Sequence, residues 1–284
     1  MSARSRATIH SSPLYHGQAL FLVAAETREA ARAAVRLARV DYEDRPALLD
    51  IAAARKAGST IEDAKTFKLG DASAALSQAK HRLKSRIAIG GQDHFYLEGQ
   101  VAMAVRGEDG DLTVYSSTQN PSEMQHVVAC VLGMAARQVI CEVRRMGGGF
   151  GGKETQSAQI AASAALVVAK TGRPAKLRLD RDDDMILTGK RHDFEAEFDV
   201  GFDGDGRLAG IDLDLASRCG YSADLSMAIN DRAMFHSDNA YFLNSAHIVS
   251  HRFRTHTVSN TAFRGFGGPQ GMMVIERAMD EIAL

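Results

Sequence analysis

The most informative stretch of this sequence is Met146-Gly147-Gly148-Gly149-Phe150-Gly151-Gly152-Lys153-Glu154. An apolar run at 139–144, typical of a strand, precedes it, and an alanine-rich run at 157–170, typical of a buried helix, follows it. Glycines let the backbone take positive φ angles and approach a ligand closely. The backbone N–H groups at a helix start can also face an anion. The stretch predicts a strand–loop–helix unit with a binding loop; the alternative is a tight turn with a structural role only.

Two common phosphate-binding loops do not fit this stretch. A Walker A loop requires Ser or Thr after its lysine, but Glu154 follows Lys153. The dinucleotide pattern G-x-G-x-x-G is matched formally, as any glycine-dense run matches it by accident. A carboxylate beside a phosphate cradle would be repulsive. The predicted ligand is therefore an oxo group or a neutral heterocycle.

A second glycine-rich stretch lies near the end of the chain: Asn260-Thr261-Ala262-Phe263-Arg264-Gly265-Phe266-Gly267-Gly268-Pro269-Gln270. A phenylalanine ring exposed on such a loop can stack on a planar ligand, and the guanidinium between the two rings can bind a carboxylate, phosphate or oxo group. The alternative is an ordinary loop whose rings are buried. Two loops of this kind in one chain favour a binding site.

The hydrophobic pattern outside these two glycine-rich stretches predicts a mixed α+β fold. The first part is expected to form a small α/β unit: a strand at 19–25, a helix capped by Thr27 and running to Ala38, extended chain at 40–42, and a helix at 72–79. After Gly90 the pattern predicts a hairpin at 101–105 and 112–115, a helix from Pro121, strands at 176–179, 194–200 and 208–215, and a helix at 271–284. Both ends of the chain are expected to be truncations.

Composition indicates an ordinary globular protein. The chain has 284 residues, of which 45% are hydrophobic and 24% charged, and its net charge is −1, which argues against nucleic-acid or anionic-membrane binding. No apolar run is long enough to span a membrane, and Met1–Arg6 precede no apolar signal region. Cys130, Cys141 and Cys219 lack disulfide or zinc spacing and are expected to be small buried residues. A cytoplasmic location is predicted.

Five motifs together resemble the molybdenum-binding subunit of xanthine dehydrogenases, in the xanthine oxidase/aldehyde oxidase family. They are Gly91–Gly99, Ser117–Asn120, the glycine stretch through Glu154, Asp231–Ala233 and Phe263–Gln270, in the family's order and spacing. The similarity is greatest to bacterial enzymes in which this subunit is a separate polypeptide. The resemblance implies an α+β fold, with a partial α/β hammerhead-like domain at 1–85 and the first part of the molybdopterin-binding domain at 86–284.

The resemblance also assigns roles to individual residues. It implies that Gln119 hydrogen-bonds an oxo ligand of molybdenum, that the backbone of Phe150 and Gly151 lines the metal, and that Arg264 lies beside the cofactor. Purine-binding residues would be the polar pair Glu154 and Arg232, together with the stacking ring of Phe266; the second ring lies outside this chain. From the residues alone, Glu154 could instead be a solvated carboxylate at a helix start. Arg232 could form a salt bridge to Asp224 or Asp231.

The implied activity is oxidative hydroxylation of xanthine or hypoxanthine to urate at a Mo-molybdopterin centre. Electrons would pass to NAD through [2Fe-2S] clusters and FAD on a partner subunit, in a hetero-oligomer. No residue here matches the family's general base, a glutamate expected beyond Leu284, so no catalytic base is assigned. Aldehyde oxidases carry apolar or uncharged residues at positions 154 and 232, which favours a purine. The alternatives are an aldehyde- or N-heterocycle-oxidising relative and a non-catalytic remnant.

Overall fold

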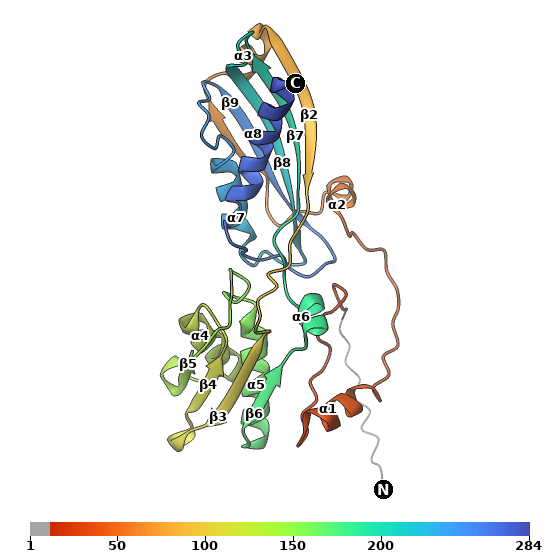
Figure 1. The fold of residues 1–284 in the computed structure, drawn as a ribbon. Helices are drawn as coiled ribbons and strands as arrows, with labels where there is room; N and C mark the ends of the chain where they lie inside the picture. Colours follow the sequence, from red (N-terminus) through yellow and green to blue (C-terminus); the bar gives the residue numbers. More distant parts are fainter. Residues whose placement is uncertain (1–11) are drawn as a thin grey trace.

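The computed structural model describes residues 12–284 and shows an α+β protein with two sheets arranged end to end in an elongated molecule (Figure 1). The α+β prediction is confirmed. The segment Met1–Arg6, for which the sequence predicts no secretory signal, lies outside the described residues. Within residues 12–284 no helix is long and apolar enough to cross a membrane.

The larger sheet has five strands, in the order β1 (Lys65–Leu69), β9 (Ala246–Arg254), β8 (Leu208–Gly220), β7 (Phe194–Phe202) and β2 (His81–Ile89). Its neighbouring strands are antiparallel except for β8 and β9. Side chains alternate between its faces: Phe194 and Phe198 on β7 are buried, whereas Glu195 and Glu197 are exposed. The helices α3 (Ala72–Gln78), α7 (Ser226–Phe235) and α8 (Gly268–Ala283) pack on its apolar side (Figure 1).

The smaller sheet has four strands, in the order β5 (Val139–Glu142), β4 (Leu112–Ser116), β3 (Val101–Arg106) and β6 (Ala175–Arg178). As predicted, β3 and β4 form a hairpin, and its turn contains a short 3-10 helix at Glu108–Gly110; a second lies at Ala136–Gln138. The helices α4 (Pro121–Leu132) and α5 (Ser157–Thr171) cover this sheet and share its apolar core. α5 ends at Thr171, one residue beyond the predicted run at 157–170, because Gly172, at φ 69°, adopts the left-handed conformation without strain.

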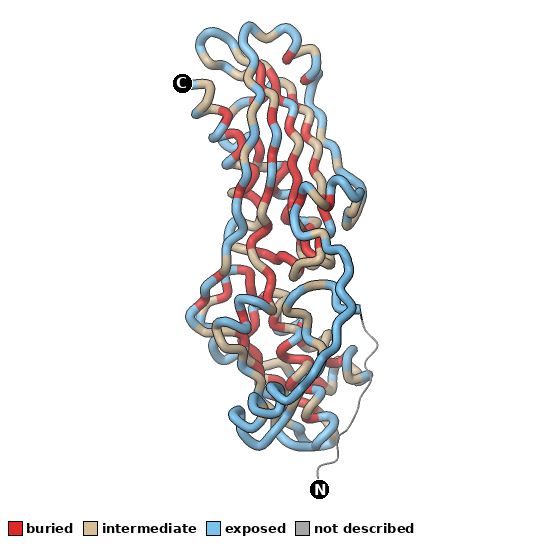
Figure 2. Tube along the Cα trace, turned by 90° about the vertical axis from the view of Figure 1, so that its right-hand side faces the viewer, coloured by how far each residue is buried: buried red, intermediate tan, exposed pale blue. Residues whose placement is uncertain are grey.

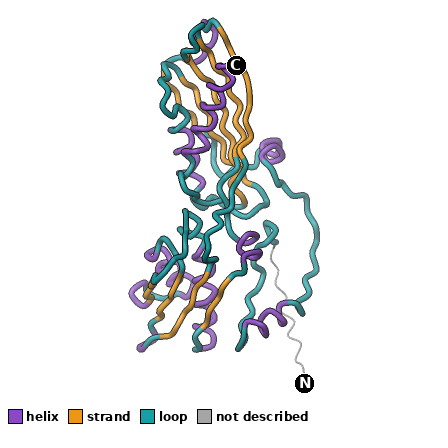
Figure 3. Tube along the Cα trace, viewed as in Figure 1, coloured by secondary structure: helices purple, strands orange, loops and turns teal. Residues whose placement is uncertain are grey.

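Of the α/β unit expected at the start of the chain, the helix at 72–79 is confirmed as α3, but the two predicted extended segments are wrong. No strand forms at 19–25 or 40–42, and α1 (Arg28–Val35) stops short of Ala38 and buries no residue. Thr27 does cap α1, but Phe21 and Leu22 are each more than two-fifths exposed. An apolar run becomes a strand only beside another strand, and none lies beside this one in the described chain. After α1 the segment instead runs as exposed loop to α2 (Ile51–Ala57) (Figures 2 and 3). The buried side of α2 packs on Phe253.

The three cysteines differ in their surroundings. Cys219 on β8 is buried, as predicted, and Cys141 on β5 is partly buried. Cys130 is exposed on α4, so the prediction of a buried residue is wrong there. Its helical position faces away from the sheet, which the sequence did not reveal because apolar residues surround it on both sides.

His192, fully buried just before β7, makes stability pH-dependent. Its Nε2 lies 2.7 Å from Ser226 Oγ at the start of α7, and burial lowers the pKa of His192 from 6.5 to about 3. The unfolded chain therefore binds the proton more readily, and stability is lost as the pH falls from 6.5 toward 3. We expect His192→Asn to unfold with a shallower pH dependence than the parent, measured by thermal melts across that range. His126→Asn, on the exposed side of α4, should keep the parent's slope; a parent curve flat over this range would contradict the assignment.

Candidate functional site

The candidate site lies where the loops of the two sheets meet (Figure 1). The glycine loop, residues 146–156, joins β5 to α5 and touches the loop that leads from β9 into α8. The backbone N–H of Arg264 donates to the carbonyl of Phe150 at 2.8 Å. A Cβ atom on Gly151 would lie 2.7 Å from the carbonyl of Ala262, closer than any side chain tolerates. The two glycine-rich stretches of the sequence therefore form one site.

Two phenylalanines in this site have a backbone conformation that bulky residues rarely adopt. Phe150 has φ 53° and Phe266 has φ 49°. Such outliers persist only where the surrounding structure enforces them, and they gather at binding sites. Phe150 is 47% exposed, so its backbone is held beside an open surface.

Phe263 has a supporting role, unlike the exposed ring that the sequence suggested. The guanidinium of Arg191 lies 3.9 Å from the centre of its ring, and the buried ring of His94 packs on it at 4.8 Å. His94 Nε2 also lies 2.6 Å from the carbonyl of Ala262. These contacts fix the second loop, in which Arg264 is exposed and Phe266 is partly buried.

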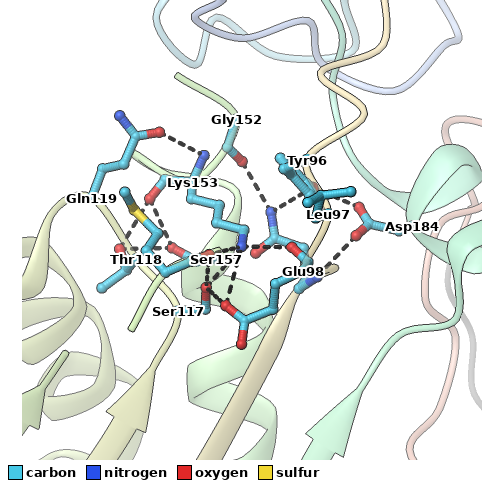
Figure 4. Close-up of polar contacts among 12 residues, drawn as sticks. Tyr96, Leu97, Glu98, Ser117, Thr118, Gln119, Gly152, Lys153, Ser157 and Asp184 are labelled. Carbon is cyan, nitrogen blue, oxygen red and sulfur yellow. Dashed lines mark hydrogen bonds and ion pairs between the residues drawn. The ribbon is translucent and has the colours of Figure 1, made fainter. Parts of the chain in front are cut away.

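Gln119 follows β4, and its side chain is tied into the glycine loop through the side-chain carbonyl only. Its Oε1 accepts hydrogen bonds from the N–H groups of Gly151 at 2.8 Å and Lys153 at 3.3 Å. The side chain is exposed, and its amide nitrogen points away from the loop (Figure 4). A fixed amide with two outward donors is suited to bind an oxygen atom of a ligand.

Sequence reasoning missed the polar network beneath the glycine loop (Figure 4). Lys153, fully buried, donates from Nζ to the carbonyls of Met146 and Glu98 and to Ser117 Oγ. Beside it, buried Asp184 accepts from the hydroxyl of Tyr96 at 2.7 Å. Burial first, and then this carboxylate, raise the pKa of Tyr96. The one signal in the sequence is the lysine directly after the glycines, which was considered only in the comparison with the Walker A pattern.

Glu154 lies at the far end of the glycine loop, half-buried and close to another carboxylate. Burial first, and then the negative charge of Asp224, raise the pKa of the Glu154 carboxyl above its ordinary value of 4.5. The alternative of a freely solvated helix-start carboxylate does not match this environment. A carboxyl group of this kind can accept or share a proton with a ligand that approaches it.

The raised pKa leads to a prediction about stability. A folded-state pKa above the unfolded value means that stability is lost as the pH rises above 4.5 through the folded pKa. Glu154→Gln resembles the protonated form, so we expect it to melt at a higher temperature than the parent at pH 7 and at the same temperature near pH 4. Glu195→Gln, exposed on β7, is the control. A variant that melts below the parent at pH 7 would contradict the assigned burial cost.

Arg232, on α7, is exposed and forms no ion pair within residues 12–284. Asp231 pairs instead with Arg252 at 2.5 Å and with Lys65 at 3.1 Å. The loop of Phe266 packs on this helix, since a Cβ atom on Gly267 would lie 2.0 Å from the carbonyl of Ile229. The fold thus places Arg232 next to the Phe266 loop with its guanidinium available.

The site therefore divides into two groups of predicted residues. Gln119, Phe150, Gly151 and Arg264 are joined directly by the contacts described above. Glu154, Arg232 and Phe266 are carried by the adjoining elements, and in the described chain no hydrogen bond or ion pair connects Glu154 with Arg232. Among residues 12–284, no three His, Cys, Asp or Glu side chains form a metal-binding cluster.

Comparison with known proteins identifies the family of this chain. Residues 55–284 match the molybdopterin cofactor-binding domain family. Over 94% of its length, the chain is 42% identical to xanthine dehydrogenase of Emericella nidulans and 42% identical to xanthine dehydrogenase/oxidase of Felis catus. It spans about a fifth of the length of these curated relatives (20% of each).

Solved structures agree on the fold. The aldehyde oxidoreductase from Desulfovibrio gigas matches with a TM-score of 0.78 and 24% identity, over 92% of this chain and 30% of that chain. Quinoline 2-oxidoreductase from Pseudomonas putida 86 matches with a TM-score of 0.81 and 20% identity, over 92% of this chain and 35% of that chain. The chain thus belongs to the molybdopterin cofactor-binding domain family.

Proposed function

We propose that this chain forms one wall of the active site of a molybdopterin-dependent hydroxylase that converts xanthine or hypoxanthine to urate. The observation that carries the proposal is the orientation of the Gln119 side chain by the glycine loop. Its side-chain carbonyl accepts from the N–H of Gly151 at 2.8 Å, and its amide nitrogen points away from the glycine loop (Figure 4). The identity of 40–42% to proteins named xanthine dehydrogenase supports the choice of a purine.

The residues present fit a molybdenum–pterin group. A Cβ atom on Gly148 would lie 3.1 Å from the ring of Phe150, and one on Gly149 would lie 2.5 Å from Gln119 Oε1 and displace that side chain. The donor set is an amide N–H pair and the exposed guanidinium of Arg264, both suited to oxygen ligands and anionic pterin substituents. In this arrangement the chain would hold molybdenum without metal-coordinating side chains of its own. Gln119 and Arg264 would contact the oxygen ligands and substituents of the cofactor, and Phe150 would line the metal with its backbone. When bound, the cofactor supplies the two-electron chemistry of the hydroxylation.

The substrate would be held by the second group of residues. Glu154 can accept or share a ring N–H proton of the purine, and this contact orients the ring. Hydroxylation builds negative charge on the heterocycle, and the guanidinium of Arg232 would stabilise that charge more in the transition state than in the ground state. The ring of Phe266 would fix the plane of the purine. No residue of this chain is assigned as the catalytic base.

The rest of the proposal concerns the whole enzyme. Electrons would leave through [2Fe-2S] clusters and FAD on a partner subunit toward NAD, in a hetero-oligomer located in the cytoplasm. Residues 1–85 would belong to the hammerhead-like part and 86–284 to the molybdopterin-binding part. In the structure, β1 precedes that boundary and β2 crosses it, and both pair with strands that follow it.

The test is a comparison of substrates with the protein as its own cells assemble it. The proposal predicts that xanthine and hypoxanthine are oxidised to urate, with kcat/KM values at least about tenfold above those for an aromatic aldehyde or quinoline. A preference for the aldehyde or quinoline would replace the purine assignment with that of an aldehyde- or N-heterocycle-oxidising relative. Turnover of none of these substrates by protein that contains molybdenum would contradict the proposal.

A further inference from the structure

Lys153 is a charged side chain in a place where charge is costly. Its side chain is 0% exposed, and it is among the largest fully buried side chains of the described chain. Burial lowers the pKa of its ammonium group. A buried charge is stable only when its donors are used and a counter-charge is near, so the contacts of Lys153 indicate why it is retained.

All three donors of the ammonium group are used. Nζ lies 2.6 Å from the carbonyl of Met146, 2.7 Å from the carbonyl of Glu98 and 2.7 Å from Ser117 Oγ. The carboxylate of Glu98, 3.7 Å away, is the counter-charge, and the ring of Tyr96 packs at 4.6 Å. Because no donor or surface remains free, Lys153 can neither touch a ligand nor act as a nucleophile.

These acceptors come from three separate segments. Glu98 precedes β3, Ser117 follows β4, and Met146 follows β5. Met146 begins the glycine loop and Lys153 lies near its end, so the hydrogen bond from Nζ to the carbonyl of Met146 closes the loop across its base. The six residues between them, 147–152, include three glycines at positive φ and the strained Phe150. Glycines alone would leave such a segment loose.

The backbone of Lys153 is hydrogen-bonded to Gln119, one of the residues proposed to face the ligand. Its carbonyl accepts from the N–H of Gln119 at 2.8 Å, and its own N–H donates to Gln119 Oε1 at 3.3 Å. Glu154 is the next residue. The position of Lys153 therefore determines both the amide that faces the cofactor site and the carboxyl group that faces the substrate site.

We propose that Lys153 is a positioning residue: its buried ammonium group closes the glycine loop across Met146, Glu98 and Ser117 and thereby orients Gln119 and Glu154. This inference rests on the proposed function for the meaning of that orientation, although the closure itself is independent of any substrate.

The first test is local hydrogen–deuterium exchange in the protein as its cells assemble it. In Lys153→Met we expect the backbone amides at positions 151, 152 and 153 to exchange at least about tenfold faster than in the parent. The amides of β4 and α5 should keep the parent's rates. Lys170→Met, on the exposed last turn of α5, should leave all of these rates unchanged. Loop exchange in Lys153→Met at the parent's rate would overturn the inference.

The second test measures molybdenum per polypeptide in the same variants. We expect less than half of the parent's content in Lys153→Met and the parent's content in Lys170→Met. If Lys153→Met does not fold, Ser117→Ala decides, because it removes one acceptor only: faster loop exchange supports the inference, and the parent's exchange rate overturns it. A loosened loop in protein that never contains molybdopterin would refute the proposed function and leave the closure intact.

Discussion

Gly149→Ala is expected to remove molybdopterin from the protein without unfolding it. A Cβ atom at this position would lie 2.5 Å from Gln119 Oε1 and 2.8 Å from its Cδ, so the amide must leave its place. The backbone of Gly149 is not at positive φ, and the clash is with the end of a flexible side chain. The fold therefore accommodates the methyl group, whereas the donors of Gln119 lose their orientation.

The expected size of this effect is large. Losing the oriented amide donors of Gln119 should cost about 3 kcal/mol in the binding of the cofactor or in the stabilisation of the transition state. This cost corresponds to a loss of about 100-fold in affinity or in rate. We predict a fall in molybdenum content of at least about tenfold with a melting temperature within about 4 °C of the parent. Gly90→Ala is the matched control, because a Cβ atom there meets nothing within 4 Å. A Gly149→Ala protein with full molybdenum content would contradict the role of Gln119.

Arg232→Gln is expected to change the choice of substrate. Removing a cation that stabilises charge on the heterocycle should lower kcat/KM for xanthine by about 100-fold or more. An aromatic aldehyde lacks that heterocycle, so its turnover should change by less than about threefold. Since Arg232 is exposed and has no ion pair in the described chain, its loss should leave the melting temperature unchanged.

Steady-state kinetics on both substrates measure this effect. Arg106→Gln, exposed at the end of β3, is the control for the loss of one positive charge and should match the parent on both substrates. Equal losses for xanthine and for the aldehyde in Arg232→Gln would mean that Arg232 supports the fold or the cofactor instead of the purine.

Local signals explain which parts of the fold could be predicted. α5 and its end at Gly172, the hairpin of β3 and β4, and the strand before the glycine loop depend on residues close together in the sequence. Edge strands were harder. β2 alternates Leu83 and Ile87 with charged residues, a period-two pattern that the many charges concealed.

Tertiary context explains the errors. The apolar run at 19–25 has the composition of a buried strand, but no neighbouring strand is available, and its side chains stay exposed. Lys153 shows the reverse case. Its burial depends on the convergence of Glu98, Ser117 and Met146 from three segments, and no local pattern reports such a convergence. The glycine loop was therefore predicted as a binding element, but its support was not.

The most direct test of the account is an experimental structure of the protein with molybdopterin bound. The account predicts that Gln119 Nε2 lies within hydrogen-bonding distance of an oxygen ligand of molybdenum while its Oε1 still accepts from the N–H of Gly151, with Phe150 beside the metal. A cofactor bound elsewhere, or a Gln119 amide turned away from it, would contradict the central claim.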